Sequence, residues 1–502
     1  MAMRIGGLAS GMDIDTIVSD LMKAERLPLN KLTKSKQTLE WQRDEYREMN
    51  KLLDEFDNYT LDNISLQSSL LKKNVKSSNS NAVSATANAS AANVSTTINV
   101  TSKAESATWI SDVSSYKAPT KDTEIELKVK NGDGSESGAI KLTIKAGATV
   151  EEILSQLSNQ KELGLSGFAQ SGKAAITKND SGAAATITLV DADAVSIFTS
   201  LGFNVDTTTD PNTGASSKTL SFNTGLGAHA GKNADFTING LRVTDKASNT
   251  FTINNVTYTL QNTGTANISV SVDSDNMFDK VVQFVNKYNE TIEKINEKLT
   301  EERYRDYQPL TDEEKEAMSE KQIEKWEELA KKGLVRNDPI LSSALIKMRS
   351  DFYNPVSGGK ISSEYSQLTQ IGIKTSSNYL DKGKLIIEDE AKLKEAIQKD
   401  PNAIYELFNA NGITAEEKGI AKRLRETISG TIKSIEQKAG KSTFTSQQYT
   451  LGRNLTQIDK QIDRFEDRLT QIEDRYWKQF TAMEKAIQQS NTQMSYLMQQ
   501  FG

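Results

Sequence analysis

Residues able to carry out acid–base or nucleophilic chemistry are restricted in type in this chain of 502 residues, which has no Cys and a single His. The absence of Cys excludes a disulfide scaffold, a thiolate nucleophile and Cys-ligated zinc or iron–sulfur sites. One His excludes a multi-His metal site, and any Ser-His-Asp triad would depend on His229 alone. Because His229 lies among small residues, in Leu226–Gly231, we interpret its role as structural.

Carboxylates are plentiful, with 67 Asp and Glu residues, so carboxylate-only chemistry stays open. The pairs Glu313/Glu314 and Glu416/Glu417 belong to highly charged stretches. These stretches predict solvated helix surfaces rather than an apolar pocket that would raise a carboxylate pKa. An enzyme with a catalytic β head and a glycan substrate is therefore only an alternative interpretation.

Two further patterns could be mistaken for ligand sites. The glycines at 6–7 and 132–138 lack the strand–loop–helix context of a phosphate site. The acidic stretch 191–193 lacks the spacing and the terminal Glu of a calcium loop. We predict that the chain is not an enzyme and has no catalytic, metal or cofactor-binding residues.

The overall charge and hydropathy exclude other classes of function. The formal net charge is −6, whereas nucleic-acid-binding proteins usually present a basic face. No stretch approaches the roughly 18 apolar residues of a membrane span, and the first residues lack the apolar run of a secretory signal. We expect no nucleic-acid partner, no membrane insertion, and a protein that is cytosolic or is exported without a cleaved signal.

The composition changes sharply near residues 77 and 273. Only 31 of the 196 residues from 77 to 272 are charged, against 97 of the other 306, and the middle is rich in Thr, Ser, Asn, Ala and Gly. This contrast predicts an α+β multidomain fold with helical coiled-coil arms from both termini and β-rich head domains in the middle. The expected domains are a helical arm (1–76), a discontinuous β head (77–107 with 224–272), an inserted α+β outer head (108–223), a mainly helical leg (273–440) with a charged helical insertion (301–337), and a C-terminal coiled-coil arm (441–502).

The N-terminal arm begins with Asp13, whose carboxylate can cap the first turn of a helix. An apolar face follows, made of Ile14, Ile17, Val18, Leu21 and Met22. Pro28 should end or kink this helix, because it lacks an amide proton. A second apolar series then repeats at heptad spacing.

The middle of the chain contains strand and hairpin patterns. The runs 124–130 and 139–145 flank an Asn-Gly-Asp-Gly turn, and the runs 235–238 and 241–244 flank Asn-Gly. The run 251–260 reads as one strand. The Ser- and Asn-rich segment 72–81 could form a hinge between head and arm, a hypothesis that proline substitution at 77–80 would test.

Helix signals return in the last half of the chain. Thr311 and Glu314 form a capping-box pattern, and Gly333 suits a left-handed helix stop. Asp338 followed by Pro339 predicts a helix start. The last stretch, from Leu451, carries the strongest apolar stripe, with spacings that alternate between four and three residues.

A helix of about 55 residues cannot bury such a stripe by itself, so it must pair with another helix. The stripes could form an intramolecular core or pack between subunits, and we favour some use between subunits. The residues predicted to form the oligomerisation or partner coil are Leu32, Leu39, Tyr46, Met49, Leu53, Phe56, Leu455, Ile458, Ile462, Phe465, Leu469, Ile472, Tyr476, Phe480, Met483 and Ile487. The terminal segment 488–502 is expected to be flexible alone and ordered when bound.

Several motifs resemble one known family. The opening, Gly7-Leu8-Ala9-Ser10-Gly11-Met12-Asp13, is similar to the start of the bacterial flagellar filament cap family, also called FliD or hook-associated protein 2. Similar family motifs are Ala234–Gly240, Ile371-Gly372-Ile373 and Arg475–Phe480. The resemblance spans both ends and the C-terminal half, while 108–223 carries no such motif.

The resemblance implies a structural protein that caps the growing filament tip and promotes folding and insertion of exported flagellin. It implies type III export, a ring homo-oligomer (commonly a pentamer), contact with flagellin and hook–filament junction proteins, and an extracellular location after a transient cytoplasmic stage. A cytosolic export chaperone would hold the C-terminal helix at Met494, Leu497 and Phe501. Adhesion is a further possible role. The alternative is another type III-exported axial or tip protein, or an adhesin, of the hook–filament junction type.

Overall fold

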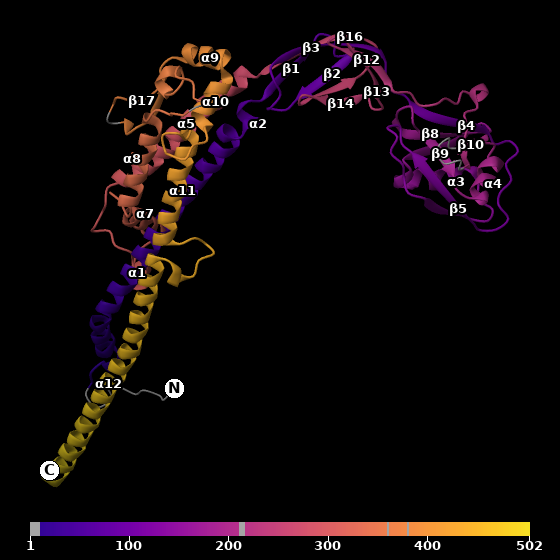
Figure 1. Cartoon of the computed structure of the whole chain (residues 1–502). Helices are drawn as coiled ribbons and strands as arrows, with labels where there is room; N and C mark the ends of the chain where they lie inside the picture. Colours follow the sequence, from indigo (N-terminus) through magenta and orange to yellow (C-terminus); the bar gives the residue numbers. More distant parts are fainter. Residues whose placement is uncertain (1–10, 210–215, 359–360, 379–380, 502) are drawn as a thin grey trace. The chain divides into compact units, whose positions relative to one another are not determined.

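The computed structural model describes residues 11–209, 216–358, 361–378 and 381–501 (Figure 1). The chain divides into two units: a helical unit of Met1–Leu70 with Ser274–Gly502, and a β-rich unit of Leu71–Asp273. The α+β class, with helices at both termini and strands in the middle, is therefore confirmed.

The first helix, α1 (Ile14–Thr60), begins where Asp13 accepts a hydrogen bond from the Thr16 amide at 3.0 Å, as predicted. The helix does not end at Pro28, which lies inside it with an exposed side chain. The missing amide proton leaves one carbonyl without its usual partner. Packing along another long helix, described below, sustains α1 through that position. A π-helical turn (Leu61–Ser65) and α2 (Gln67–Leu70) follow.

Several helices of the helical unit meet at the second half of α1. Phe284 brings the helices together, because its ring contacts those of Phe56, Phe352 and Phe408 at centroid distances of 6.0, 6.1 and 5.9 Å. The elements are α5 (Ser274–Thr300), α8 (Pro339–Tyr353), α9 (Glu390–Lys399), α10 (Pro401–Asn409), α11 (Ile420–Ala439), α12 (Thr450–Phe501), the short 3-10 turns Leu368–Ile371 and Ser446–Gln448, and the paired strands β17 (Ile373–Thr375) and β18 (Leu385–Ile387).

The charged segment 301–337 is helical only in part. It contains α6 (Asp312–Glu316) and α7 (Glu320–Lys331), whereas 301–311 is not helical. The Thr311–Glu314 capping box is present, and Gly333 has a φ of 70°. Asp338 caps α8 with Pro339 in its first turn. The local start and stop signals were therefore read correctly, but not the extent of helix.

The β-rich unit contains two hydrophobic cores. The first lies in two antiparallel sheets, ordered β1-β16-β3-β12-β13 and β14-β15-β2. Phe236, Phe251 and Tyr258 stack inside it. Its strands are β1 (Lys73–Ser77), β2 (Val83–Ala87), β3 (Val94–Ser102), β12 (Ala234–Ile238), β13 (Leu241–Lys246), β14 (Thr250–Ile253), β15 (Val256–Leu260) and β16 (Gly264–Val272).

The second core surrounds Trp109, whose indole N–H donates to the Leu220 carbonyl at 3.2 Å. The sheets here are ordered β10-β11-β9-β5-β6 and β4-β8-β7. The elements are β4 (Ser106–Asp112), β5 (Thr123–Lys130), β6 (Ile140–Ile144), α3 (Val150–Asn159), β7 (Leu165–Gln170), β8 (Lys173–Ser181), β9 (Thr186–Leu189), α4 (Ala192–Ser200), β10 (Val205–Thr209) and β11 (Ser216–Leu220), with 3-10 turns at Lys161–Leu163 and Thr224–Leu226.

Both predicted hairpins are present, since β5 pairs with β6 and β12 pairs with β13. The single strand expected over 251–260 is wrong. It is instead the hairpin β14–β15, reversed at Asn254 and Asn255, whose φ values are 50° and 65°. Asn tolerates positive φ better than most residues, so the Asn pair was a turn signal that the sequence analysis missed.

The segment 72–81, predicted as a hinge, begins beside the division between the two units and continues into the β-rich unit. Residues 78–82 form the turn between β1 and β2 inside the β-rich unit, and the division between units falls at Leu70/Leu71. The turn is held by hydrogen bonds from the Ser78 amide to the Asn267 carbonyl (3.0 Å) and from the Ser77 hydroxyl to the Val83 carbonyl (2.7 Å). The Ser77 side chain thus holds this turn, and movement at the joint stays a prediction.

Gly182 lies where three segments of the β-rich unit approach one another. A Cβ at this position would lie 2.4 Å from the Gly132 carbonyl oxygen and 2.6 Å from the Ala247 Cβ, and φ is +125°. Only a residue without a side chain fits both the space and the backbone conformation.

Candidate partner-binding surfaces

The residues first considered for chemistry lie at the surface. His229 is exposed, and its backbone exchanges two 2.9 Å hydrogen bonds with Thr108 in an isolated bridge. Among the described residues, no group of three or more His, Asp or Glu side chains is arranged to hold a metal ion. In the same part of the chain, no helix has the length and apolar character that a bilayer crossing requires.

The two acidic pairs have structural contacts. Glu314 forms the capping box of α6 and an ion pair with Lys34 at 2.7 Å. Glu416 and Glu417 lie in the loop before α11, not on a helix as expected. The Glu417 carboxylate accepts the amides of Ile413 and Thr414, and these hydrogen bonds lower its pKa.

Four residues predicted to form a partner coil lie inside the helical unit. Tyr46, Met49, Leu53 and Phe56 are each at most 3% exposed. Phe56 packs on Phe284, and its ring centroid is 6.1 Å from that of Tyr288. Their apolar surface is therefore enclosed by the same chain, which corresponds to the intramolecular alternative for this part of the stripe.

A buried polar contact fixes α1 against α8. The Tyr46 hydroxyl donates to the Asp338 carboxylate, which also accepts the amides of Ile340 and Leu341 at 3.0 Å each. Burial, together with the hydrogen bond to Asp338, raises the pKa of Tyr46 well above its usual range. Asp338 thus caps one helix while it holds another.

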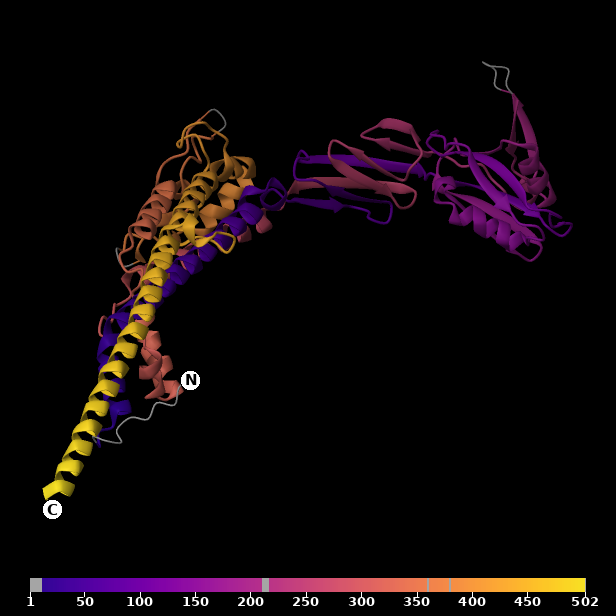
Figure 2. The same cartoon turned by 90° about the horizontal axis from the view of Figure 1, so that it is seen from below.

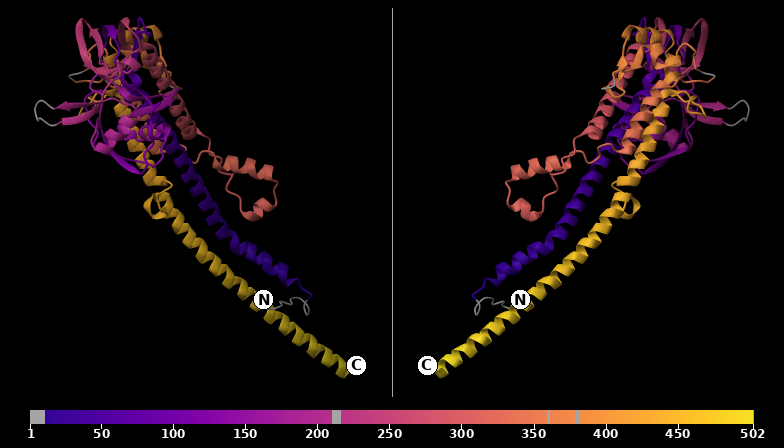
Figure 3. Two further views of the ribbon diagram at one scale, coloured as in Figure 1. Left: turned by 90° about the vertical axis from the view of Figure 1, so that its right-hand side faces the viewer. Right: turned by 90° about the vertical axis from the view of Figure 1, so that its left-hand side faces the viewer.

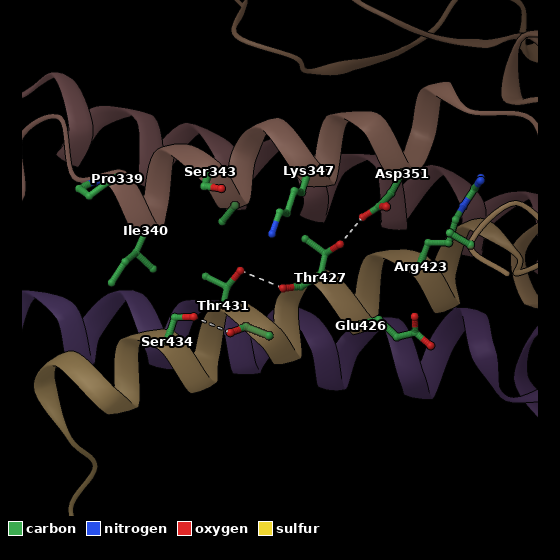
Figure 4. Close-up of a pocket in the computed structure, with 13 residues that line it drawn as sticks. Pro339, Ile340, Ser343, Lys347, Asp351, Arg423, Glu426, Thr427, Thr431 and Ser434 are labelled. Atoms are coloured by element: carbon green, nitrogen blue, oxygen red, sulfur yellow. Dashed lines mark hydrogen bonds between the residues drawn. The ribbon is translucent and has the colours of Figure 1, made fainter. Parts of the chain in front are cut away.

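A groove runs between α8 and α11, lined by small residues and a few charged ones (Figure 4). Asp351 from α8 accepts a 2.7 Å hydrogen bond from the Thr427 hydroxyl of α11. Burial raises the pKa of Asp351 in spite of this bond. Arg423, only 4% exposed, donates to the carbonyls of Asn354 and Pro355 at 2.8 and 3.3 Å. The groove therefore joins two helices of one unit through polar contacts, although the Nε atom of Arg423 is buried without a hydrogen-bond partner among the described residues.

The two terminal helices pair in an antiparallel manner. The Lys36 ammonium is 2.8 Å from the Asp459 carboxylate, and the Tyr476 hydroxyl donates to Glu25 at 3.0 Å. Residue numbers therefore increase along α12 in the direction in which they decrease along α1. Figures 2 and 3 show the two helices side by side. The shared apolar cluster consists of Ile14, Val18, Met22, Leu469 and Ile472, with Leu29, Tyr476, Trp477 and Phe480 packed against it.

The pairing ends before α12 does. Ile487 is the last residue of α12 that is partly buried, and every residue from Gln488 to Gln500 is exposed. Figure 3 shows α12 continuing past the beginning of α1. We call Gln488–Gln500 the distal segment. It includes Met494, Tyr496, Leu497 and Met498, which are 53–69% exposed.

One side of α1 is also open. The sequence placed Ile14, Ile17, Val18, Leu21 and Met22 on one face, but only Ile14, Val18 and Met22 are buried. Ile17 is partly buried, whereas Leu21 and Leu27 are 38% and 61% exposed. We define the open face of α1 by Ile17, Leu21, Ala24, Leu27 and Pro28. The sequence analysis missed Leu27, because it expected the helix to stop or bend beside it.

The remaining predicted coil residues differ in burial. Leu455, Leu469 and Ile472 are 6–8% exposed. The partly buried ones are Leu32, Leu39, Ile458, Ile462, Phe465, Tyr476, Phe480, Met483 and Ile487. Met494 and Leu497, predicted to contact a chaperone, lie in the distal segment. The side chain of Phe501, the glycines 6–7 and the opening motif up to Ser10 lie outside the described residues.

Comparison with protein families finds two models that match this chain. The flagellar hook-associated protein 2 N-terminus model matches residues 10–107, and the flagellar hook-associated protein 2 C-terminus model matches residues 231–492. Together the two matches include both terminal helices and the first β core. Residues 108–230, which carry the second β core, lie between them.

Comparison with individual proteins finds flagellar hook-associated protein 2 sequences and a flagellar cap protein structure. The flagellar hook-associated protein 2 of Halalkalibacterium halodurans is 35% identical over 560 aligned positions, covering 99% of this chain and 100% of the relative. That of Thermotoga maritima is 29% identical over 243 positions, covering 47% of this chain and 35% of the relative. The crystal structure of the D1-D2-D3 domains of the flagellar cap protein FliD from Escherichia coli superimposes with a TM-score of 0.54 at 20% identity, covering 82% of this chain and 99% of that one.

Proposed function

The chain belongs to the flagellar hook-associated protein 2 family and has a structural role in the cap of the flagellar filament; from this premise we propose that it promotes folding and insertion of exported flagellin at the filament tip. The protein assembles as an oligomer at that tip, outside the cell. Type III export after a cytoplasmic stage, a ring of about five subunits, contact with hook–filament junction proteins and a cytosolic chaperone on the distal segment belong to this proposal.

The observation that carries the proposal is the uncovered end of α12. The segment 488–502 has no charged residue, and Met494, Tyr496, Leu497 and Met498 are more than half exposed in the single subunit. Exposed apolar surface on this scale is typical of a binding site for another protein. Met side chains adapt to partners of different shape, which suits a segment that meets a chaperone before export and other subunits after it.

The β-rich unit supports the proposal in a second way. It carries its own two hydrophobic cores, so it can keep its fold while the terminal helices exchange partners. We propose that this unit provides the head beneath which flagellin folds, and that the terminal helices form coiled-coil arms that anchor it to the filament. Adhesion stays a prediction.

Complementation of a strain that lacks the gene tests the proposed function. The full chain is expected to restore filaments, whereas a chain truncated after Ile487 should release flagellin as monomer into the medium. An exchange of Gln499 for Ala, in the same exposed segment, serves as a control and should restore filaments. Normal filaments from the deletion strain would contradict the proposal.

A further inference from the structure

We propose that the distal segment of α12 in one subunit packs on the open face of α1 in a neighbouring subunit, so that the terminal helices join the copies of the assembly head to tail. The inference rests on the proposed self-assembly and names the surfaces that perform it. It commits to a second copy of this chain as the partner.

The first argument is that the apolar stripe of α12 continues beyond its partner in the same subunit. Tyr476, Phe480, Met483 and Ile487 repeat at intervals of three or four residues along α1. The same rhythm, after Ser490, places Met494 and Leu497 on the same side of the helix. The surface that already binds an α1 helix thus extends onto residues that face solvent.

The second argument is that a subunit cannot cover this surface with its own α1. The helix α12 is continuous from Thr450 to Phe501, so the distal segment does not fold back. In the antiparallel register fixed by the Glu25–Tyr476 contact, α1 begins near the position of Ile487. An α1 helix for the distal segment must therefore come from another copy.

The third argument is that α1 has a second apolar side ready for such a helix. Ile17, Leu21, Ala24 and Pro28 follow spacings of four, three and four residues, and so lie along one side of the helix, with Leu27 beside them. Arg26 precedes Leu27, and Lys34 lies two turns further along the same side of the helix; they pair with Glu313 and Glu314 of α6 at 3.8 and 2.7 Å. The charged insertion thus borders the open face without covering Leu27, which stays 61% exposed.

The chemistry of the two surfaces matches. The distal segment carries no charge, and its Met and Leu side chains can be buried against Ile17, Leu21 and Leu27, while the stems of the flanking Lys23 and Lys31 add apolar surface at the edge. The contact joins two different surfaces, and contacts of this heterologous type generate rings when the rotation closes. Each subunit has one surface of each kind, so each can bind one neighbour on either side.

The natural absence of Cys allows a direct test by cross-linking of full-length chains. Leu27→Cys and Leu497→Cys chains are prepared separately, mixed at a concentration at which the wild type oligomerises, and oxidised. The mixture should give a disulfide-linked dimer that contains one chain of each kind, and neither variant alone should give it. The double variant should give a ladder of linked chains.

Matched controls separate this contact from random collision. Tyr496→Cys lies beside Leu497 with similar exposure but points away from the stripe, and Ser19→Cys lies on α1 away from the open face. Pairs that contain either control should cross-link several-fold less. Strong linkage of Leu497→Cys to itself would indicate tail-to-tail pairing and overturn the proposal, as would equal linkage of the controls.

The outcomes also separate this inference from the proposed function. A wild-type chain that sediments as a monomer at every concentration would overturn both. A chain that oligomerises and restores filaments, but shows no link between Leu27→Cys and Leu497→Cys, would overturn only the placement of the distal segment.

Discussion

The Tyr46 hydroxyl and the Asp338 carboxylate, 292 positions apart in sequence, share a buried hydrogen bond that ties the middle of α1 to the first turn of α8. The same carboxylate accepts two amides of α8. One acidic side chain therefore stabilises both the start of a helix and its contact with the longest helix of the N-terminal region.

Removal of either partner should destabilise the helical unit. We expect Tyr46→Phe to lower the free energy of unfolding by about 1.5–3 kcal/mol, because it breaks a hydrogen bond to a charged group. Asp338→Ala should cost more, since it also removes the helix cap, whereas Asp338→Asn should retain most of the capping. Urea denaturation followed by circular dichroism measures these losses. If the two effects simply add in the double variant, the residues are not coupled.

Truncation of Phe56 and truncation of Leu27, both on α1, should change stability by very different amounts. Phe56→Ala removes a fully buried ring from the centre of the helical unit and should cost about 3–5 kcal/mol. Leu27→Ala should change stability by no more than about 0.5 kcal/mol, because the side chain is exposed. Thermal unfolding of the free subunit tests both. A large loss for Leu27→Ala would mean that this side of α1 is covered in the free subunit.

Stability should depend on pH through Asp351 in a direction set by its burial. The folded state raises the pKa of this carboxyl above its ordinary value of 3.8, so it holds the proton more tightly than the unfolded chain does. The contribution of the protonated Asp351 carboxyl to stability is fully present below pH 3.8. It is lost as the pH rises through the raised pKa. Asp351→Asn, which can still accept from Thr427, should therefore stabilise the protein at pH 7 and lose that advantage at low pH.

Denaturation midpoints measured from pH 3 to 7 test this dependence. The exposed Asp54→Asn exchange on α1 is the control and should not show the same trend. An advantage of Asp351→Asn that does not change with pH would show that titration of this carboxyl is not its cause.

Gly182→Ala should destabilise the β-rich unit by more than about 2 kcal/mol, because the new methyl group meets backbone and the residue has positive φ. Gly138→Ala is a matched control in the same unit, with no atom within 4 Å of its new Cβ. Hydrogen exchange of the amides in β8 measures the difference. Equal protection in both variants would contradict the assignment of close packing at Gly182.

Local signals in the sequence predicted much of the fold. Asp13, Thr311 and Asp338 cap helices as expected, and the Asn239–Gly240 turn joins its two strands. These features depend on neighbouring residues and backbone preferences, which sequence carries directly. Other features of the fold depend on tertiary packing and differ from the prediction. Pro28 lies inside α1 because α12 packs along it, and Tyr46 belongs to a core rather than a partner surface.

The sequence predicted only part of the candidate binding surface, because the rest depends on tertiary packing. The apolar rhythm showed that α12 needs a partner, but not where pairing within one subunit would stop. That limit depends on the register between α1 and α12, fixed by contacts such as Lys36–Asp459. Leu27 became a candidate only after the structure showed that α1 continues past Pro28.

The first and last strands of the β-rich unit are hydrogen-bonded neighbours: Lys73 faces Val272, and the Asp273 amide donates to the Lys72 carbonyl at 2.8 Å. The chain thus enters and leaves this unit through one narrow double-stranded neck. Because the two ends of the unit lie side by side, a change of length inside it leaves the spacing between entry and exit the same. Under the proposed role of this unit as the head, its exposed surface can therefore vary while the terminal helices keep their own core.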